Sequence, residues 1–227
     1  MAIRLEAVRL FGSTARGDAD DLSDLDILIV VSRLSERTFR RAQRFGVHIF
    51  GATTAVSVYS AERLRELYSS GALFAWHLFL ESKNLAPERG TDLIEQLGQP
   101  ADTPDLHGYL NELFDLSKSI IRELEGQPGS LVYEAGILYL ASRNAGIAAC
   151  WKHRILPVFS RYAPFQAGEY LSIPFPLSKG NFDTYYLARR ASNTGAMPPK
   201  IESDTLYKDA KSITKWISLI SEKIHAQ

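Results

Sequence analysis

Short apolar runs alternate with stretches of helical spacing in the first hundred residues of the chain. The run at 7–11 ends at a glycine, and the run at 25–31 is β-branched and nearly continuous, which is typical of a buried central strand. A third strand is predicted over 47–59, with a break or bulge near Gly51. Helices are predicted at 35–45, 61–69 and 72–81.

The spacing of apolar residues becomes helical throughout beyond residue 104. Long amphipathic helices are predicted at 106–124, 131–151 and 204–224. The intervening segment 156–199 is rich in proline and aromatic residues, and we expect short helices and loops packed on the bundle there. Residues 98–104 contain Gly and two Pro residues and lack periodicity, so they are expected to form a linker.

These patterns predict an α+β protein with two domains. Residues 1–98 should form a mixed sheet flanked by helices, because strands and helices alternate along them. Residues 105–227 should form a mostly α-helical domain.

Composition narrows the class of protein. The 227 residues include 26 Lys and Arg against 26 Asp and Glu, so a polyanion-binding site, if present, has to be local. The single cysteine, Cys150, excludes an internal disulfide framework and fits the reducing cytoplasm, where we expect the protein. The longest aliphatic run, at 27–31, is far shorter than the roughly 20 residues that span a bilayer, so no membrane partner is expected.

Two polar elements at the start of the chain suggest phosphate and metal chemistry. Asp24 and Asp26 stand two residues apart at the start of a predicted strand, so their carboxylates project to the same side and favour a hard divalent cation such as Mg²⁺. Gly12 and Ser13 close the preceding strand and open a helical turn, where backbone N–H groups and the hydroxyl favour a phosphate. This combination suits phosphoryl or nucleotidyl transfer.

The sequence FGSTARGD followed by SDLDILIV resembles the nucleotidyltransferase superfamily typified by DNA polymerase beta. It looks especially like the minimal bacterial nucleotidyltransferases, which include antibiotic nucleotidyltransferases and antitoxin-type proteins. The close likeness covers about the first 31 residues. It implies that Asp24 and Asp26 bind Mg²⁺ and act in catalysis, and that Gly12 and Ser13 hold the nucleotide phosphates. Arg16 is a further candidate for a phosphate contact or a structural one.

One position departs from the pattern of the superfamily, which usually has a third carboxylate on a later strand. Ser57 stands where that acid is expected. Glu62 and Glu81 are candidates to replace it; otherwise the acceptor is activated differently, or catalysis has been lost and nucleotide binding remains.

Other polar patterns have both functional and structural interpretations. His77 and Glu81 are four apart on a predicted helix and could orient a base, contribute a metal ligand, form a buried hydrogen-bonded pair or dock the helix end on the sheet. The arginines at 33, 37, 40 and 44 and the lysines at 208, 211 and 215 form stripes that could follow RNA or be solvated faces. The aromatic segment 159–186, followed by Arg189 and Arg190, could stack an acceptor or form core. A ribonuclease motif of the HEPN class is absent, since His153 lies too far from Arg143.

Two functions follow from these observations. The first is Mg²⁺-dependent transfer of a nucleoside monophosphate from an NTP, with ATP as the expected donor, to a hydroxyl of a small molecule, a tRNA or a protein. The helical domain would then select the acceptor. The second is a nucleotide-binding, antitoxin-like regulatory protein with weak or lost chemistry. A homodimer and a complex with a partner protein both stay open.

Overall fold

The computed structural model describes residues 4–51, 54–87, 90–102, 105–152 and 159–226. The chain forms two compact units, Met1–Pro104 and Asp105–Gln227. The expected linker is ordered through residue 102 and packs on the first unit, because the Ala101 N–H donates to the Tyr68 carbonyl and the Trp76 indole donates to the Ala101 carbonyl, at 2.9 and 3.1 Å. Residues 103 and 104 lie outside the described residues.

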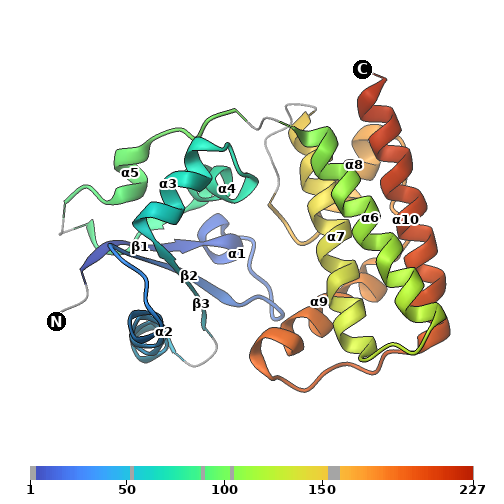
Figure 1. Cartoon of the computed structure of the whole chain (residues 1–227), viewed down its shortest axis with the longest axis horizontal. Coiled ribbons are helices and arrows are strands. Elements are labelled where there is room, and N and C mark those ends of the chain that lie inside the picture. The colour runs from blue at the N-terminus through green and yellow to red at the C-terminus, as the bar shows by residue number, and fades with distance from the viewer. Residues whose placement is uncertain (1–3, 52–53, 88–89, 103–104, 153–158, 227) are drawn as a thin grey trace. The chain divides into compact units, whose positions relative to one another are not determined.

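The first unit is built on a four-stranded mixed sheet of order β3-β2-β1-β4 (Figure 1). Its strands are β1 (Leu5–Phe11), β2 (Leu25–Val31), β3 (Thr54–Ser60) and β4 (Lys83–Asn84). Strand β2 pairs antiparallel with β1 and parallel with β3, while β4 pairs antiparallel with β1. The continuous apolar run in β2 is explained by its central place in the sheet, which buries both of its faces.

Helices cover both faces of this sheet, and the predicted α+β architecture is confirmed. Alternate residues of β2 enter different cores: Leu28 and Val30 pack with α3 and α4, whereas Ile27, Ile29 and Val31 pack with α2. The helices of this unit are α1 (Gly12–Arg16), α2 (Glu36–Phe50), α3 (Ala61–Ser69), α4 (Leu73–Glu81) and α5 (Leu93–Leu97).

The third strand is shorter than predicted, because residues 47–50 belong to α2 rather than to β3. Gly46 does not end the helix. It lies inside α2, where the absence of a side chain lets the helix approach Val56 and Ile29 of the sheet. The helix ends instead at Gly51, whose φ of 102° is open to glycine and rarely to other residues.

A buried ion pair connects the start of the first unit to its end. The guanidinium of Arg9 in β1 donates to both carboxylate oxygens of Asp92, at 2.7 and 2.8 Å, and to Glu95 at 3.0 Å. Asp92 is also the N-cap of α5 and forms a capping box with Glu95. One carboxylate therefore begins a helix and neutralises a buried charge.

The second unit is a helical bundle, as predicted. Its helices are α6 (Leu106–Glu125), α7 (Leu131–Lys152), α8 (Ala163–Leu171), α9 (Lys179–Thr194) and α10 (Ser203–His225). Helix α7 packs against all four others, and its glycines allow close approach: Gly146 lies against Ala163 and Pro164, and Gly136 against Arg189. The expectation of only short helices between 156 and 199 is wrong, because α9 extends over 16 residues. Within the described parts of both units, no helix is long and apolar enough to cross a membrane.

Candidate functional site

The glycine-serine turn lies directly against one of the two predicted metal-binding carboxylates. Phe11, the last residue of β1, is in register with Asp26 of β2. Gly12 follows with a φ of 72°, and a Cβ on it would collide with the Asp26 carboxylate, whose Cγ would be only 3.2 Å away. Glycine is therefore required twice here, for its backbone conformation and for the contact.

Asp24 and Asp26 are both partly exposed at the start of β2. Asp26 is on the face of the sheet that carries Leu28, which is the face covered by α3 and α4. Asp24 directly precedes the strand. Both carboxylates thus come from one short segment that meets the start of α1.

This arrangement fits a Mg²⁺ ion that arrives with a nucleotide. Among the described residues, no group of three or more His, Cys, Asp or Glu side chains could hold a metal. Magnesium in nucleotide-processing sites is held by one or two carboxylates together with substrate phosphates and water. Asp24 and Asp26 supply such a pair of oxygen ligands, and the turn at Gly12 packs directly against the second of them.

The strand beside Asp26 offers no acid on the same face. Ala55 is directly in register with Asp26, and Ser57 is in register with Leu28 two residues further on. Glu62, one proposed replacement, begins beyond the opposite end of β3, because Ser60 pairs with Val31. Six residues of strand place it roughly 20 Å from Asp26, so Glu62 is wrong as a replacement.

Glu81, the other candidate, joins α4 to the last residue of α1. Its Oε2 atom accepts from the Arg16 guanidinium at 2.8 Å and lies 3.0 Å from His77 Nε2. Burial raises the pKa of the Glu81 carboxyl, but hydrogen bonds from His77 and Arg16 outweigh it, and the pKa is lowered. Glu81 is therefore ionised and engaged by two partners.

Arg16 is held by two carboxylates. Besides Glu81, its guanidinium contacts Asp18 at 3.1 Å. Burial lowers the pKa of Arg16, but bonds to Glu81 and Asp18 outweigh this and raise it. At the other end of α1, the ring of Phe11 packs edge-on against His77, with 5.5 Å between centroids. The pair His77 and Glu81 thus contacts residues at both ends of the turn that carries Gly12 and Ser13.

The remaining sequence candidates have structural contacts. Phe159, Phe175, Phe182 and Tyr185 are buried in the core of the second unit. Arg143 donates to the Phe159 carbonyl at 2.6 Å. The arginines at 33, 37, 40 and 44 are exposed, and Arg40 pairs with Glu36.

Sequence reasoning missed Thr54, which begins β3 next to Leu25. Its hydroxyl is buried and has no hydrogen-bond partner among the described residues. A single threonine at a strand start carries no sequence signal, so only the packing of α2 over the strand identifies it.

The first unit thus carries the glycine-serine turn and the paired aspartates side by side on its mixed sheet. Residues 4–67 match the family model of the nucleotidyltransferase domain, and the first unit of the chain contains this domain. The predicted class of enzyme, a nucleotidyltransferase, is confirmed at that level.

Comparison with other known sequences and structures adds little to this family match. No curated protein sequence matches the chain. Among solved structures, the chain is similar to a spectinomycin adenyltransferase from Enterococcus faecialis in complex with ATP and spectinomycin. The identity is 15%, the TM-score is 0.48, and the match covers 98% of this chain and 92% of the other.

Proposed function

We propose that the protein is a Mg²⁺-dependent nucleotidyltransferase that transfers a nucleoside monophosphate, AMP from ATP as the expected donor, to an acceptor hydroxyl. The observation that carries this proposal is the contact between Gly12 and the Asp26 carboxylate. This contact supports the proposal because it joins the turn that we propose to bind phosphate to the strand that we propose to bind the metal.

Each residue of the site has a defined task in this proposal. The backbone at Gly12 and the hydroxyl of Ser13 bind the triphosphate, and Asp24 and Asp26 hold Mg²⁺ against it. The ion neutralises charge on the phosphates when bound. Arg16 acts as an anchor for α1 through Glu81 rather than as a phosphate ligand.

The reaction exchanges one phosphorus–oxygen bond for another. The acceptor hydroxyl oxygen attacks the α-phosphorus in line, the bond from that phosphorus to the bridging oxygen breaks, and pyrophosphate leaves. The hydroxyl proton passes to solvent or to a base outside β3, because Ala55 and Ser57 offer no carboxylate there. The helical unit selects the acceptor, which is a small molecule, a tRNA or a protein.

The same absence of an acid on β3 favours a second candidate function. A nucleotide-binding regulatory protein, of the antitoxin-like kind, needs the turn and the aspartates but no base for the acceptor. Such a protein would bind NTP with Mg²⁺ and transfer nothing.

Thermal unfolding with each NTP, with and without Mg²⁺, tests the shared part of both functions. A ligand at about 100 times its Kd stabilises by about 2.7 kcal/mol, which raises Tm by several degrees for a protein of this size. We expect a Mg²⁺-dependent rise with one NTP that Asp26→Asn abolishes and the exposed control Asp102→Asn retains. No rise with any NTP would overturn both functions.

Transfer of label from an α-labelled NTP distinguishes the two. Incorporation into a tRNA, a protein or an added small molecule, lost in Asp26→Asn, establishes the enzyme. Binding without incorporation, together with a stable protein complex, establishes the regulatory protein.

A further inference from the structure

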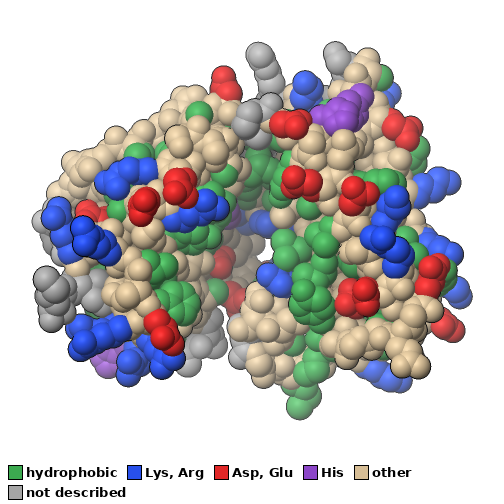
Figure 2. Space-filling model, viewed as in Figure 1, with side chains coloured by type: hydrophobic (Ala, Val, Ile, Leu, Met, Phe, Trp, Pro, Cys, Tyr) green, Lys and Arg blue, Asp and Glu red, His purple; other side chains and the backbone are tan. Residues whose placement is uncertain are grey.

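The most strongly charged surface of the first unit lies on α2 and the loop before it. Residues 33–48 contain five arginines and a single acid, Glu36, in a chain whose formal net charge is zero. All five arginines are exposed. One is paired with Glu36, namely Arg40, and Arg33 and Arg37 form no ion pair with the described residues. Figure 2 shows Lys and Arg side chains gathered over this helix, at the lower left of the view.

The arginines recur every three or four residues, so they rise along the helix at about one turn, or 5.4 Å, per step. Two aromatic rings of the same helix are also exposed: Phe39 and Phe45 are 37% and 43% exposed. Guanidinium groups bind phosphate oxygens in pairs of hydrogen bonds, and exposed rings stack nucleobases. Guanidinium groups at one-turn intervals, with exposed rings on other faces of the same helix, offer both kinds of contact to a polynucleotide, which repeats phosphate and base.

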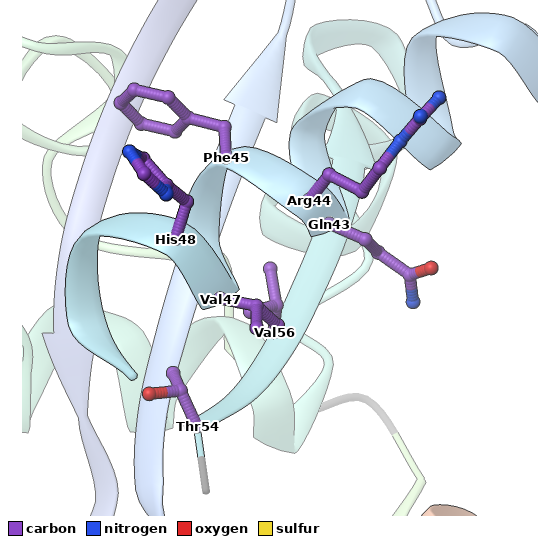
Figure 3. A pocket seen from close by; sticks show the side chains of 7 residues that line it. All are labelled: Gln43, Arg44, Phe45, Val47, His48, Thr54 and Val56. Carbon is purple, nitrogen blue, oxygen red and sulfur yellow. The ribbon is translucent and has the colours of Figure 1, made fainter. Parts of the chain in front are cut away.

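A groove of about 900 Å³ adjoins this row, between the second half of α2 and the start of β3. Figure 3 shows its lining: Phe45 and His48 project from one side of the helix and Gln43 and Arg44 from the other, with Val47 and Val56 between them. The groove therefore combines an apolar floor with an aromatic ring, an amide, an imidazole and a guanidinium. Nucleotide units are held by this mixture of stacking and hydrogen bonding.

An unsatisfied hydroxyl in the same groove points independently to a polar ligand. Thr54 lines the groove, is 9% exposed, and its Oγ1 has no hydrogen-bond partner among the described residues. A buried hydroxyl without a partner destabilises a fold unless a ligand or water completes it. Valine would fill the same volume without this cost.

The groove opens at the same end of the sheet as the predicted metal site. Thr54 is in register with Leu25, which stands between Asp24 and Asp26 in the sequence. Because alternate residues face opposite ways, Thr54 lies on the α2 face and Asp26 on the other. A polynucleotide bound along α2 would thus reach the edge of the sheet where nucleotidyl transfer is proposed.

From these contacts we propose that α2 and the adjoining groove bind a single-stranded polynucleotide. The arginines hold its phosphates, Phe45 stacks a base, and Thr54 donates to or accepts from a base or sugar. That this polynucleotide is the acceptor of the nucleotide rests on the proposed function. That it binds to α2 and the groove does not depend on the proposed function.

Fluorescence anisotropy with labelled oligonucleotides of mixed sequence tests this surface. We expect the wild type to bind a single strand, of RNA or DNA, more tightly than a duplex. The double variant Arg37→Glu/Arg44→Glu should lose about tenfold or more in affinity, and the slope of log affinity against log salt should become shallower by roughly 1.4. Parallel RNA and DNA titrations identify the natural strand.

Matched variants separate a specific surface from general charge. Arg63→Glu/Arg65→Glu makes the same charge change on exposed residues of α3 and should keep the affinity within about twofold. Phe45→Ala should lose roughly 5- to 150-fold. Thr54→Val should weaken binding while raising Tm, a combination that a damaged fold does not produce.

Several results would overturn the proposal: no single-strand binding by the wild type, equal loss in the α3 variant, or preference for a duplex. Self-association of the wild type that Arg37→Glu/Arg44→Glu abolishes, without oligonucleotide binding, would instead make this face a contact between copies. An Mg²⁺-dependent NTP shift is measured in the same samples. If Tm does not rise with NTP and Mg²⁺ but the oligonucleotide still binds, the proposed nucleotidyl transfer is overturned and the proposed polynucleotide-binding surface is kept.

Discussion

Gly12 begins α1 and Gly17 follows its last residue, and both have positive φ, yet their surroundings differ. A Cβ on Gly12 would collide with Asp26, whereas a Cβ on Gly17 would meet nothing within 4 Å. Gly17→Ala should therefore lower the free energy of unfolding by only the cost of the left-handed backbone conformation, about 1–2 kcal/mol. Gly12→Ala should lose more stability, and its Mg²⁺-dependent NTP shift should disappear because Asp26 is displaced.

Urea unfolding and thermal shifts on the two variants measure this difference. Gly17→Ala is the control for the backbone conformation alone. Equal losses in the two variants would contradict the role given to the contact with Asp26.

Glu81 lies between Arg16 and His77 in a largely buried place, its side chain being 12% exposed. Glu81→Gln keeps the shape but removes the charge that holds Arg16 and His77. We expect a loss of roughly 1–3 kcal/mol in the free energy of unfolding at pH 7. The NTP affinity should fall as well, since α1 loses its anchor.

The lowered pKa of Glu81 determines how this loss of stability changes with pH. Because the pKa of Glu81 is lowered in the fold, its contribution is present above the ordinary pKa near 4.5 and is lost as the pH falls through the lowered value. The gap in unfolding free energy between wild type and Glu81→Gln should therefore shrink on acidification below pH 4.5. A gap that stays constant to pH 3 would assign the effect to shape rather than charge.

At the scale of elements, the position of α2 depends on one missing methyl group. A Cβ on Gly46 would lie 2.7 and 3.0 Å from the two methyl carbons of Val56. Gly46→Ala should therefore destabilise the first unit by about 1–3 kcal/mol, although alanine is the better helix former.

Val56→Ala added to Gly46→Ala tests this argument, because it removes the methyl groups that collide. The double variant should be more stable than the sum of the single losses predicts, by at least 0.5 kcal/mol in a double-mutant cycle. Additive losses would show that α2 is displaced by something other than Val56.

Gly46 also shows why the end of a helix was hard to predict. In sequence, a glycine after an amphipathic run reads as a cap, and only the packing against β3 reveals a close approach. The β-branched run of β2, by contrast, was predicted with its exact range, because burial on both faces leaves a local signal. The 16-residue α9 was missed, since its polar and aromatic residues obscure the helical period.

The features of the candidate site likewise differ in whether the sequence could predict them. Gly12, Ser13, Asp24 and Asp26 lie within fifteen residues, so their pattern was readable from the sequence. Their roles in catalysis stay predictions. The link between Arg16 and Glu81 spans 65 residues, and the pairing of Ala55 with Asp26 depends on strand register. Neither contact could be obtained without the fold.

At the scale of the molecule, the two compact units should unfold separately. Each has its own core, with the break between them at residues 104 and 105. Calorimetry should show two transitions, and an NTP with Mg²⁺ should raise the one that belongs to the first unit. Asp26→Asn should remove that rise and leave the other transition where it is. A single transition that shifts as a whole would contradict this.

The division into an α/β unit and a helical unit was predictable from the change in apolar period near residue 105. The end of the first unit was harder to predict from the sequence. Residues 99–102 carry turn signals, yet backbone and indole hydrogen bonds hold Ala101 to that unit. Breaker residues mark where regular structure stops and say nothing about where packing stops.

The ion pair between Arg9 and Asp92 has a consequence for the order in which the protein is made. Arg9 leaves the ribosome before its partner Asp92, which follows 83 residues later. At a synthesis rate of about 5–20 residues per second, roughly 4–17 s separate them. During that time β1 carries an uncompensated cation that opposes burial, so the nascent sheet waits for α5. The family match ends at residue 67, whereas the partner that completes this ion pair is supplied by the N-cap of α5, a helix that ends at Leu97.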